Sequence, residues 1–293
     1  MSGLAHHDLA RMVTDEGDRV VLVPAGADLT SSGEVALAEI AGRTFDDLSE
    51  LLEAAGGDLS RIVPGRAWRW TSPGQFLSAV GRPRKVVCVG LNYRTHILEG
   101  GRPIPDHPEL FPKFASSLTG PFADIAMPLA TSRIDWEAEA VIVIGRHCRH
   151  VAARDAADAV LGYSIANDVS VRDYQGHASQ WMAGKAWDAS TPLGPVIVPK
   201  ERCGGVDVDL AMTGRLNGEV IQSARTSDLV FGVAALVEYI TSFMSLDAGD
   251  VVLTGTPGGV GAALKPPRFL QEGDIFEVEI DGMPILRNRF VQS

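Results

Sequence analysis

The sequence IDWEAEAVIVIG, residues 134–145, joins two acidic residues to an apolar run rich in Val and Ile. The run is too short for a typical helix, and its β-branched residues predict a buried strand. Because alternate residues of a strand point to the same face, Glu137 and Glu139 share a face with Val141 and Val143. We therefore expect both carboxylates to point inward, about 6.6 Å apart along the backbone.

Two inward-facing carboxylates conflict, since like charges repel and burial removes their hydration. A proton or a cation must resolve this conflict. Hard ions such as Mg²⁺ and Mn²⁺ prefer carboxylate oxygens, and Asp168 is a candidate for a third such ligand. The residues therefore predict a metal site at Glu137, Glu139 and Asp168. The alternative is a solvated strand edge that carries surface acids.

The composition is that of an ordinary globular enzyme, and 293 residues suffice for one large domain, alone or with a small one. Acidic residues outnumber basic ones by 37 to 26, and the sequence has no cluster of Lys or Arg for a phosphate backbone. We therefore expect no nucleic-acid partner. No stretch reaches the length of a membrane span and the N-terminus lacks the plan of a secretory signal, so we expect a cytoplasmic protein with no membrane partner.

A domain boundary is predicted near Arg82. Prolines and glycines interrupt the pattern from Pro64 to Pro83, and a fresh apolar strand begins at Lys85. This places a small N-terminal domain of unknown role at residues 1–81 and the catalytic domain at residues 82–293.

Strands are expected in many places and helices in few. Thr44 and Gly56 are the expected ends of one helix, and Asp281-Gly282 predicts a hairpin. The predicted helices are 45–54 and 227–245, and the predicted strands include 19–23, 85–90 and 134–145 and lie within 246–253, 270–280 and 285–291. Because strands and helices do not alternate regularly, the pattern predicts an α+β fold.

Residues 92–112 are polar and crowded with proline and glycine, which predicts a long loop that acts as an active-site lid. Within it, His96 and Glu99 are three residues apart, so one helical turn would bring them into contact. A carboxylate raises the basicity of a neighbouring imidazole, and the pair would then activate a water molecule. The alternative is a solvent-facing helical ion pair.

Further polar residues follow the apolar segment 160–163, where buried polar groups need partners. A ligand role for Asp168, with Arg172 and Gln175 holding substrate oxygens, would satisfy them. The alternative, a helix capped by Asp168 or Ser170, is compatible with this role.

Two more features suit an anionic ligand. Lys185 would stabilise a developing enolate or carboxylate, the alternative being a surface lysine. The segment TGTPGGVG at residues 254–261 would bring backbone amides and hydroxyls close to an anion, although it lacks the spacing of a nucleotide phosphate loop.

Taken in order, these segments resemble the fumarylacetoacetate hydrolase family from about residue 85 to 291. Single motifs are short, but their order is specific. The matching residues are Val89-Gly90-Leu91-Asn92-Tyr93, His96, Glu99, Asp135-Trp136-Glu137-Ala138-Glu139, Asn167-Asp168-Val169-Ser170, Arg172-Asp173, Gln175, Gly184-Lys185, Pro192-Leu193-Gly194-Pro195, Asn217-Gly218-Glu219 and Thr254-Gly255-Thr256-Pro257.

The resemblance implies a mixed, mostly β catalytic domain of layered sheets, usually found as a homodimer, that binds Mg²⁺ or Mn²⁺. The metal ligands it implies are Glu137, Glu139 and Asp168. It also implies a water-activating dyad of His96 and Glu99. The residues that would contact substrate or stabilise charge are Lys185, Arg172, Gln175 and Thr256.

These roles predict a metal-dependent hydrolase that cleaves a carbon–carbon bond in an acylpyruvate or related 2,4-diketo acid. The dyad would deliver hydroxide to the distal carbonyl, and a pyruvate-like enolate would leave, stabilised by the cation and Lys185. The same enolate forms in decarboxylation, so an oxaloacetate-type 2-oxo acid decarboxylase, or an isomerase or hydratase of aromatic catabolism, is the alternative. A non-catalytic protein that keeps the metal pocket is more distant, since His96, Glu99 and Lys185 are all present.

Overall fold

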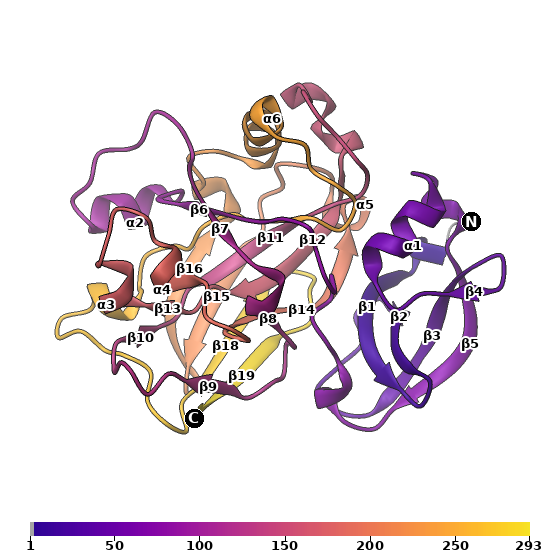
Figure 1. Ribbon diagram of the computed structural model, residues 1–293, viewed down its shortest axis with the longest axis horizontal. Helices are drawn as coiled ribbons and strands as arrows, with labels where there is room; N and C mark the ends of the chain where they lie inside the picture. The colour runs from indigo at the N-terminus through magenta and orange to yellow at the C-terminus, as the bar shows by residue number, and fades with distance from the viewer. Residues whose placement is uncertain (1–2) are drawn as a thin grey trace.

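A computed structural model of the chain describes residues 3–293, in which strands predominate over helices (Figure 1). The strands are β1 (His7–Thr14), β2 (Gly17–Pro24), β3 (Gly33–Ile40), β4 (Arg43–Thr44), β5 (Val63–Trp70), β6 (Val86–Gly90), β7 (Glu109–Lys113), β8 (Leu118–Thr119), β9 (Ile125–Met127), β10 (Ile134–Asp135), β11 (Ala138–Ile144), β12 (Val160–Asn167), β13 (Ser170–Val171), β14 (Thr191–Pro199), β15 (Ala211–Leu216), β16 (Glu219–Arg225), β17 (Val251–Leu253), β18 (Ile275–Ile280) and β19 (Leu286–Gln292). The helices are α1 (Leu48–Ala55), α2 (Arg94–Glu99), α3 (Arg172–Gln175), α4 (Met182–Lys185), α5 (Lys200–Cys203) and α6 (Val233–Phe243). The predicted α+β class is confirmed.

The described strands form a 12-stranded sheet, a 5-stranded sheet and a separate pair. The large sheet has the order β4-β3-β2-β1-β14-β12-β11-β17-β6-β7, with β5 beside β3 and β8 beside β14. The 5-stranded sheet runs β16-β15-β18-β19-β9 and contains the β18–β19 hairpin predicted at Asp281-Gly282. Strand β11 lies between β12 and β17, and its residues are buried on both faces of the sheet.

The alternation predicted for β11 is confirmed. Val141 and Val143 join one buried apolar cluster, whereas Ile142 and Ile144 join the other. The prediction of one strand over residues 134–145 is wrong, however, because the chain leaves the large sheet before Ala138 and β10 pairs with β13 instead. Trp136 lies at this break, where its ring is 5.9 Å from that of Phe276 and its indole N–H donates to Gly259 O at 3.1 Å.

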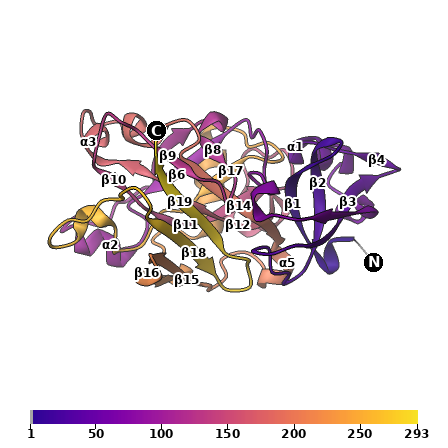
Figure 2. The same ribbon diagram turned by 90° about the horizontal axis from the view of Figure 1, so that it is seen from below.

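The first five strands and α1 lie at one end of the molecule in both views (Figures 1 and 2). They join the rest of the large sheet through β1, which pairs with β14 at Leu9 and Ile197. The predicted helix at 45–54 begins later, at Leu48, because the carboxylate of Asp47 accepts the Ser49 N–H at 2.9 Å and caps it. It ends as predicted at Gly56, whose φ of 64° favours glycine.

The predicted helix at 227–245 is also shorter than expected. Helix α6 begins at Val233, after a single tight turn at Thr226–Asp228, and the Ala234 N–H donates to the carboxylate of Asp207 at 3.1 Å. Its buried apolar residues, which include Leu236 and Ile240, belong to the same apolar cluster as one face of β11, so one face of the helix packs on the core as predicted.

Candidate active site

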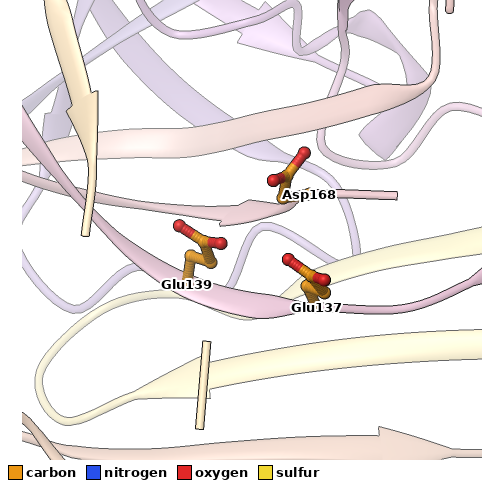
Figure 3. A group of neighbouring side chains, drawn as sticks. All are labelled: Glu137, Glu139 and Asp168. Carbon is orange, nitrogen blue, oxygen red and sulfur yellow. The ribbon is translucent and has the colours of Figure 1, made fainter. Parts of the chain in front are cut away.

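Three buried carboxylates converge at the end of the β11–β12 pair (Figure 3). Glu139 lies in β11, and Glu137 precedes that strand by one residue. The antiparallel register pairs Ala138 with Asn167, so Asp168 comes to lie opposite Glu137, and the Asp168 N–H donates to Glu137 O at 2.9 Å. One ligand atom from each carboxylate lies within 4.8 Å of the others. The structure thus brings together the three residues predicted as metal ligands.

Two buried lysines contact this group. The ammonium of Lys185 lies 2.6 Å from Glu137 Oε2 and 2.7 Å from Asp168 Oδ2. Lys113, at the end of β7, binds the other oxygen of Asp168. Lys185 reaches the site because α4 packs closely on α3, where a Cβ on Gly184 would lie 2.5 Å from Gln175 Cβ. Lys185 is therefore not the surface lysine of the alternative interpretation.

Arg172 forms the side of the site next to Glu137. Its Nε lies 2.7 Å from Asp135 Oδ2, and its Nη1 lies 2.8 Å from Glu137 Oε1 and 3.0 Å from Gln175 Oε1. Its Nη2 is buried without a hydrogen-bond partner among the described residues. The free Nη2–H groups can therefore donate to a ligand in the pocket. The alternative interpretation, in which Asp168 or Ser170 caps the helix that carries Arg172, is wrong, because Val171 precedes α3 and the helix has no side-chain cap.

The charges of the site do not cancel. Three cationic side chains, Lys113, Lys185 and Arg172, contact three of its carboxylates, whereas Glu139 has no cationic contact among the described residues. Burial opposes ionisation of Glu137, yet Lys185 and Arg172 lower its pKa to about 2. Burial, together with the charges of Asp168 and Glu137, raises the pKa of Glu139 well above its usual range. A divalent cation would remove this conflict, and the all-oxygen donor set suits a hard ion.

The predicted glycine-rich loop supports the carboxylates themselves. Gly255, at φ 96°, donates its N–H to Glu139 Oε2 at 2.8 Å, and a Cβ there would lie 2.9 Å from Val89 O. The N–H groups of Gly261 and Ala262 donate to Asp135. The loop was predicted to donate hydrogen bonds to an anionic ligand. It does donate them to carboxylates, but these carboxylates belong to the protein.

A pocket of about 400 Å³ opens above Glu137 and Lys185. Its volume is in the range of small-molecule sites. The lining includes all four residues predicted to contact substrate or stabilise charge, namely Lys185, Arg172, Gln175 and Thr256. The Thr256 hydroxyl accepts a hydrogen bond from Gln222 Nε2 at 2.9 Å, so its own proton is free to point into the pocket.

His96 and Glu99 share one face of α2, as their spacing predicted. His96 lines the pocket, and its Nδ1 lies 3.6 Å from Glu99 Oε2, which is longer than a hydrogen bond. This Nδ1 is buried without a hydrogen-bond partner among residues 3–293. Glu99 Oε2 accepts the Gly259 N–H at 3.3 Å, so the loop orients the carboxylate.

Sequence reasoning missed Lys113 and Gln222. Lys113 is a charged residue that directly follows the apolar residues of β7, and this was the available signal. Gln222 is buried on β16 and links Ala138 N–H to the loop at Thr256 and Pro257, which no local pattern indicates.

Lys113→Met is expected to lower the free energy of unfolding by about 3 kcal/mol in EDTA, because it leaves a buried charge on Asp168 short of a partner. Chemical denaturation measures this change. The exposed Lys265→Met is the matched control and should change stability by less than about 0.5 kcal/mol. Equal stabilities of the two variants would contradict the role of Lys113.

The fumarylacetoacetate hydrolase C-terminal profile matches residues 85–291. The chain belongs to the fumarylacetoacetate hydrolase family. The human protein named mitochondrial oxaloacetate tautomerase FAHD2A is 43% identical over 218 residues, which cover 74% of this chain and 69% of that protein. The similar proteins named here are enzymes, so the chain belongs to a family of enzymes.

Solved structures of the family match nearly the whole chain. A fumarylacetoacetate hydrolase from the psychrophile Exiguobacterium antarcticum superposes with a TM-score of 0.83 at 33% identity, covering 98% of this chain and all of that one. A 5-carboxymethyl-2-hydroxymuconate delta-isomerase from Mycobacterium smegmatis gives a TM-score of 0.76 at 32% identity, with 98% and 100% coverage. These matches therefore include most of the N-terminal segment that lies outside the profile.

Proposed function

We propose that the chain is a divalent-metal-dependent enzyme that interconverts the keto and enol forms of a 2-oxo acid of the oxaloacetate kind. The observation that carries this proposal is the pocket floor, where a cationic Lys185 and a free donor on Arg172 adjoin three carboxylates able to hold a metal. Such an arrangement favours an enolate over a neutral ligand. The names of the similar proteins point to the same chemistry.

The residues have separate roles in holding the substrate. We assign the free Nη2 of Arg172 to the 1-carboxylate, with Gln175 and Asp135 fixing the guanidinium plane. The hydroxyl of Thr256 donates to a second substrate oxygen. Mg²⁺ or Mn²⁺, held by Glu137, Glu139 and Asp168, would act as a Lewis acid toward the 2-oxo acid.

Lys185 places a full positive charge where negative charge develops on the oxygen at C2. Burial disfavours this charge, but Asp168 and Glu137 raise the pKa of Lys185 above its usual value, so it stays protonated at neutral pH. The side chain therefore acts as a fixed cation and not as a base.

His96 is the candidate for moving the proton at C3. In ketonisation the proton on the C2 oxygen leaves to solvent, and protonated His96 delivers one to C3. His96 then takes a proton from water, so the proton count balances over a turnover. The unpartnered Nδ1 of His96, with Glu99 nearby, suits a group that gains and loses a proton.

The test follows the enol absorbance of oxaloacetate together with release of CO₂. With Mg²⁺, the wild type is expected to speed the loss of enol absorbance without releasing CO₂ above the uncatalysed rate. CO₂ release that matches the loss of absorbance would instead assign the chain as a decarboxylase.

The second candidate is the hydrolase that cleaves acylpyruvates, and the pairing of His96 with Glu99 beside the pocket favours it. Hydrolysis needs an oriented, activated water, whereas tautomerisation needs only proton transfer. Glu99→Gln is therefore expected to abolish any acylpyruvate cleavage and to spare much of the tautomerase rate. Equal loss of both activities would mean that Glu99 does not act on water alone.

The loop after α2 is expected to become ordered when the pocket fills. Residues 103–108 contain no helix or strand, so few backbone hydrogen bonds hold them. Oxalate, which mimics the pyruvate enolate, should slow hydrogen exchange of residues 97–109 in the presence of Mg²⁺. Identical exchange with and without oxalate would contradict a lid.

Three further proposals stand beside this function. We propose that residues 1–81 form a small N-terminal domain and residues 82–293 the catalytic domain, that the chain forms a homodimer, and that it is cytoplasmic. No helix among residues 3–293 is long and apolar enough to cross a membrane. The similar human protein is named as mitochondrial.

A further inference from the structure

Arg102 lines the same pocket as His96 and Arg172 but, unlike the other cations there, has no ion pair with a described Asp or Glu. It is exposed, and it follows α2 directly after Gly101. Its N–H donates to Ile97 O at 3.1 Å, so its backbone is fixed to the end of the helix. An unpaired guanidinium that lines a pocket is available to an anionic ligand.

The charged residues of the pocket lie at two depths. Glu137 and Lys185 are only 7% and 2% exposed and form the floor, whereas Arg102 is exposed and lies at the rim. Phe111 and Trp181, whose ring centroids are 5.5 Å apart, form an apolar part of the lining. The pocket therefore suits a short ligand with an anionic group at each end and carbon between them.

We propose that Arg102 binds the second carboxylate of a 2-oxo dicarboxylic acid and sets the preference for dicarboxylates over monocarboxylates. This inference rests on the proposed function, which places the 2-oxo acid end of the ligand at the floor. Arg102 is then a substrate-binding residue that takes no part in moving the proton.

The test uses oxaloacetate and 2-oxobutyrate, which differ in having a carboxylate or a methyl group at the far end. Arg102→Gln is expected to raise both the KM for oxaloacetate tautomerisation and the Kd for oxaloacetate by about 10- to 100-fold, because a charge-assisted hydrogen bond is lost. Its kcat should stay within about 3-fold. The Kd for 2-oxobutyrate should not change, since the methyl group has no polar contact to lose.

Two variants serve as controls. Arg94→Gln removes the same charge from an exposed position on α2 that does not line the pocket, and it should behave as wild type. Arg102→Lys keeps the charge without the fork of donors and should recover part of the affinity. Quenching of tryptophan fluorescence in Mg²⁺-loaded protein gives both Kd values, since Trp181 lines the pocket.

The outcomes separate this proposal from the proposed function. If the wild type binds oxaloacetate in an Arg102-dependent manner but does not tautomerise it, the function fails and the role of Arg102 stands. If the wild type tautomerises oxaloacetate while Arg102→Gln and Arg94→Gln have the same Kd, the role of Arg102 is wrong. Equal weakening of oxaloacetate and 2-oxobutyrate by Arg102→Gln would overturn it as well.

Discussion

Glu139→Gln is expected to lower the metal-dependent rate by about 10³-fold, because Lewis-acid stabilisation of several kcal/mol is lost and each 1.36 kcal/mol is a factor of ten. Glu139 is the carboxylate of the site with no cationic contact among the described residues, so it has most to gain from a bound ion. Removing it leaves two carboxylates, which give a hard ion too few protein oxygens.

Metal binding by this variant has a readout that does not depend on activity. At a free Mg²⁺ concentration of 100 Kd, the free energy of unfolding of the wild type should rise by about 2.7 kcal/mol. Glu139→Gln should show almost none of this increase. The exposed Glu272→Gln is the matched control and should gain stability from Mg²⁺ as the wild type does. A full increase in Glu139→Gln would show that the ion binds elsewhere.

His96→Ala is expected to lower kcat by about 10²- to 10⁴-fold, the usual contribution of a general acid or base. Oxalate affinity should stay within about 3-fold of the wild type, because the groups assigned to the 2-oxo acid end lie on α3, α4 and the 254–261 loop. Steady-state rates and oxalate titration measure the two quantities. His6→Ala removes an exposed imidazole and should change neither. An unchanged rate in His96→Ala would mean that another group moves the proton.

The carboxylate triad could be predicted from the sequence because its geometry depends on short-range rules. Strand alternation directs Glu139 to the same side as Val141, and Asp168 directly follows the next strand along the chain. The placement of His96 and Glu99 on one helical turn follows from the same kind of local spacing. Local spacing rules do not connect motifs that lie far apart along the chain. The resemblance to the family connected them through their order over about two hundred residues.

The remaining features depend on contacts between distant segments. Lys113 contacts Asp168 although β11, β17 and β6 separate β7 from β12 in the large sheet, and no local pattern reports such a contact. At the break, the side chain of Trp136 packs on Phe276, 140 residues away along the chain, and no local pattern reports this contact. Asp47 and Thr44 are both ordinary N-cap residues, and only the β4 strand before the helix decides between them.

The most direct test of the central claim is the rate of oxaloacetate tautomerisation by metal-free wild type as Mg²⁺ is added back. The enol absorbance is followed first in EDTA and then over a Mg²⁺ titration, with Glu139→Gln measured alongside. We predict a rate near the uncatalysed one in EDTA and a saturable increase with Mg²⁺ that Glu139→Gln does not show. A full rate in EDTA, or the same Mg²⁺ response in both proteins, would contradict a catalytic metal at Glu137, Glu139 and Asp168.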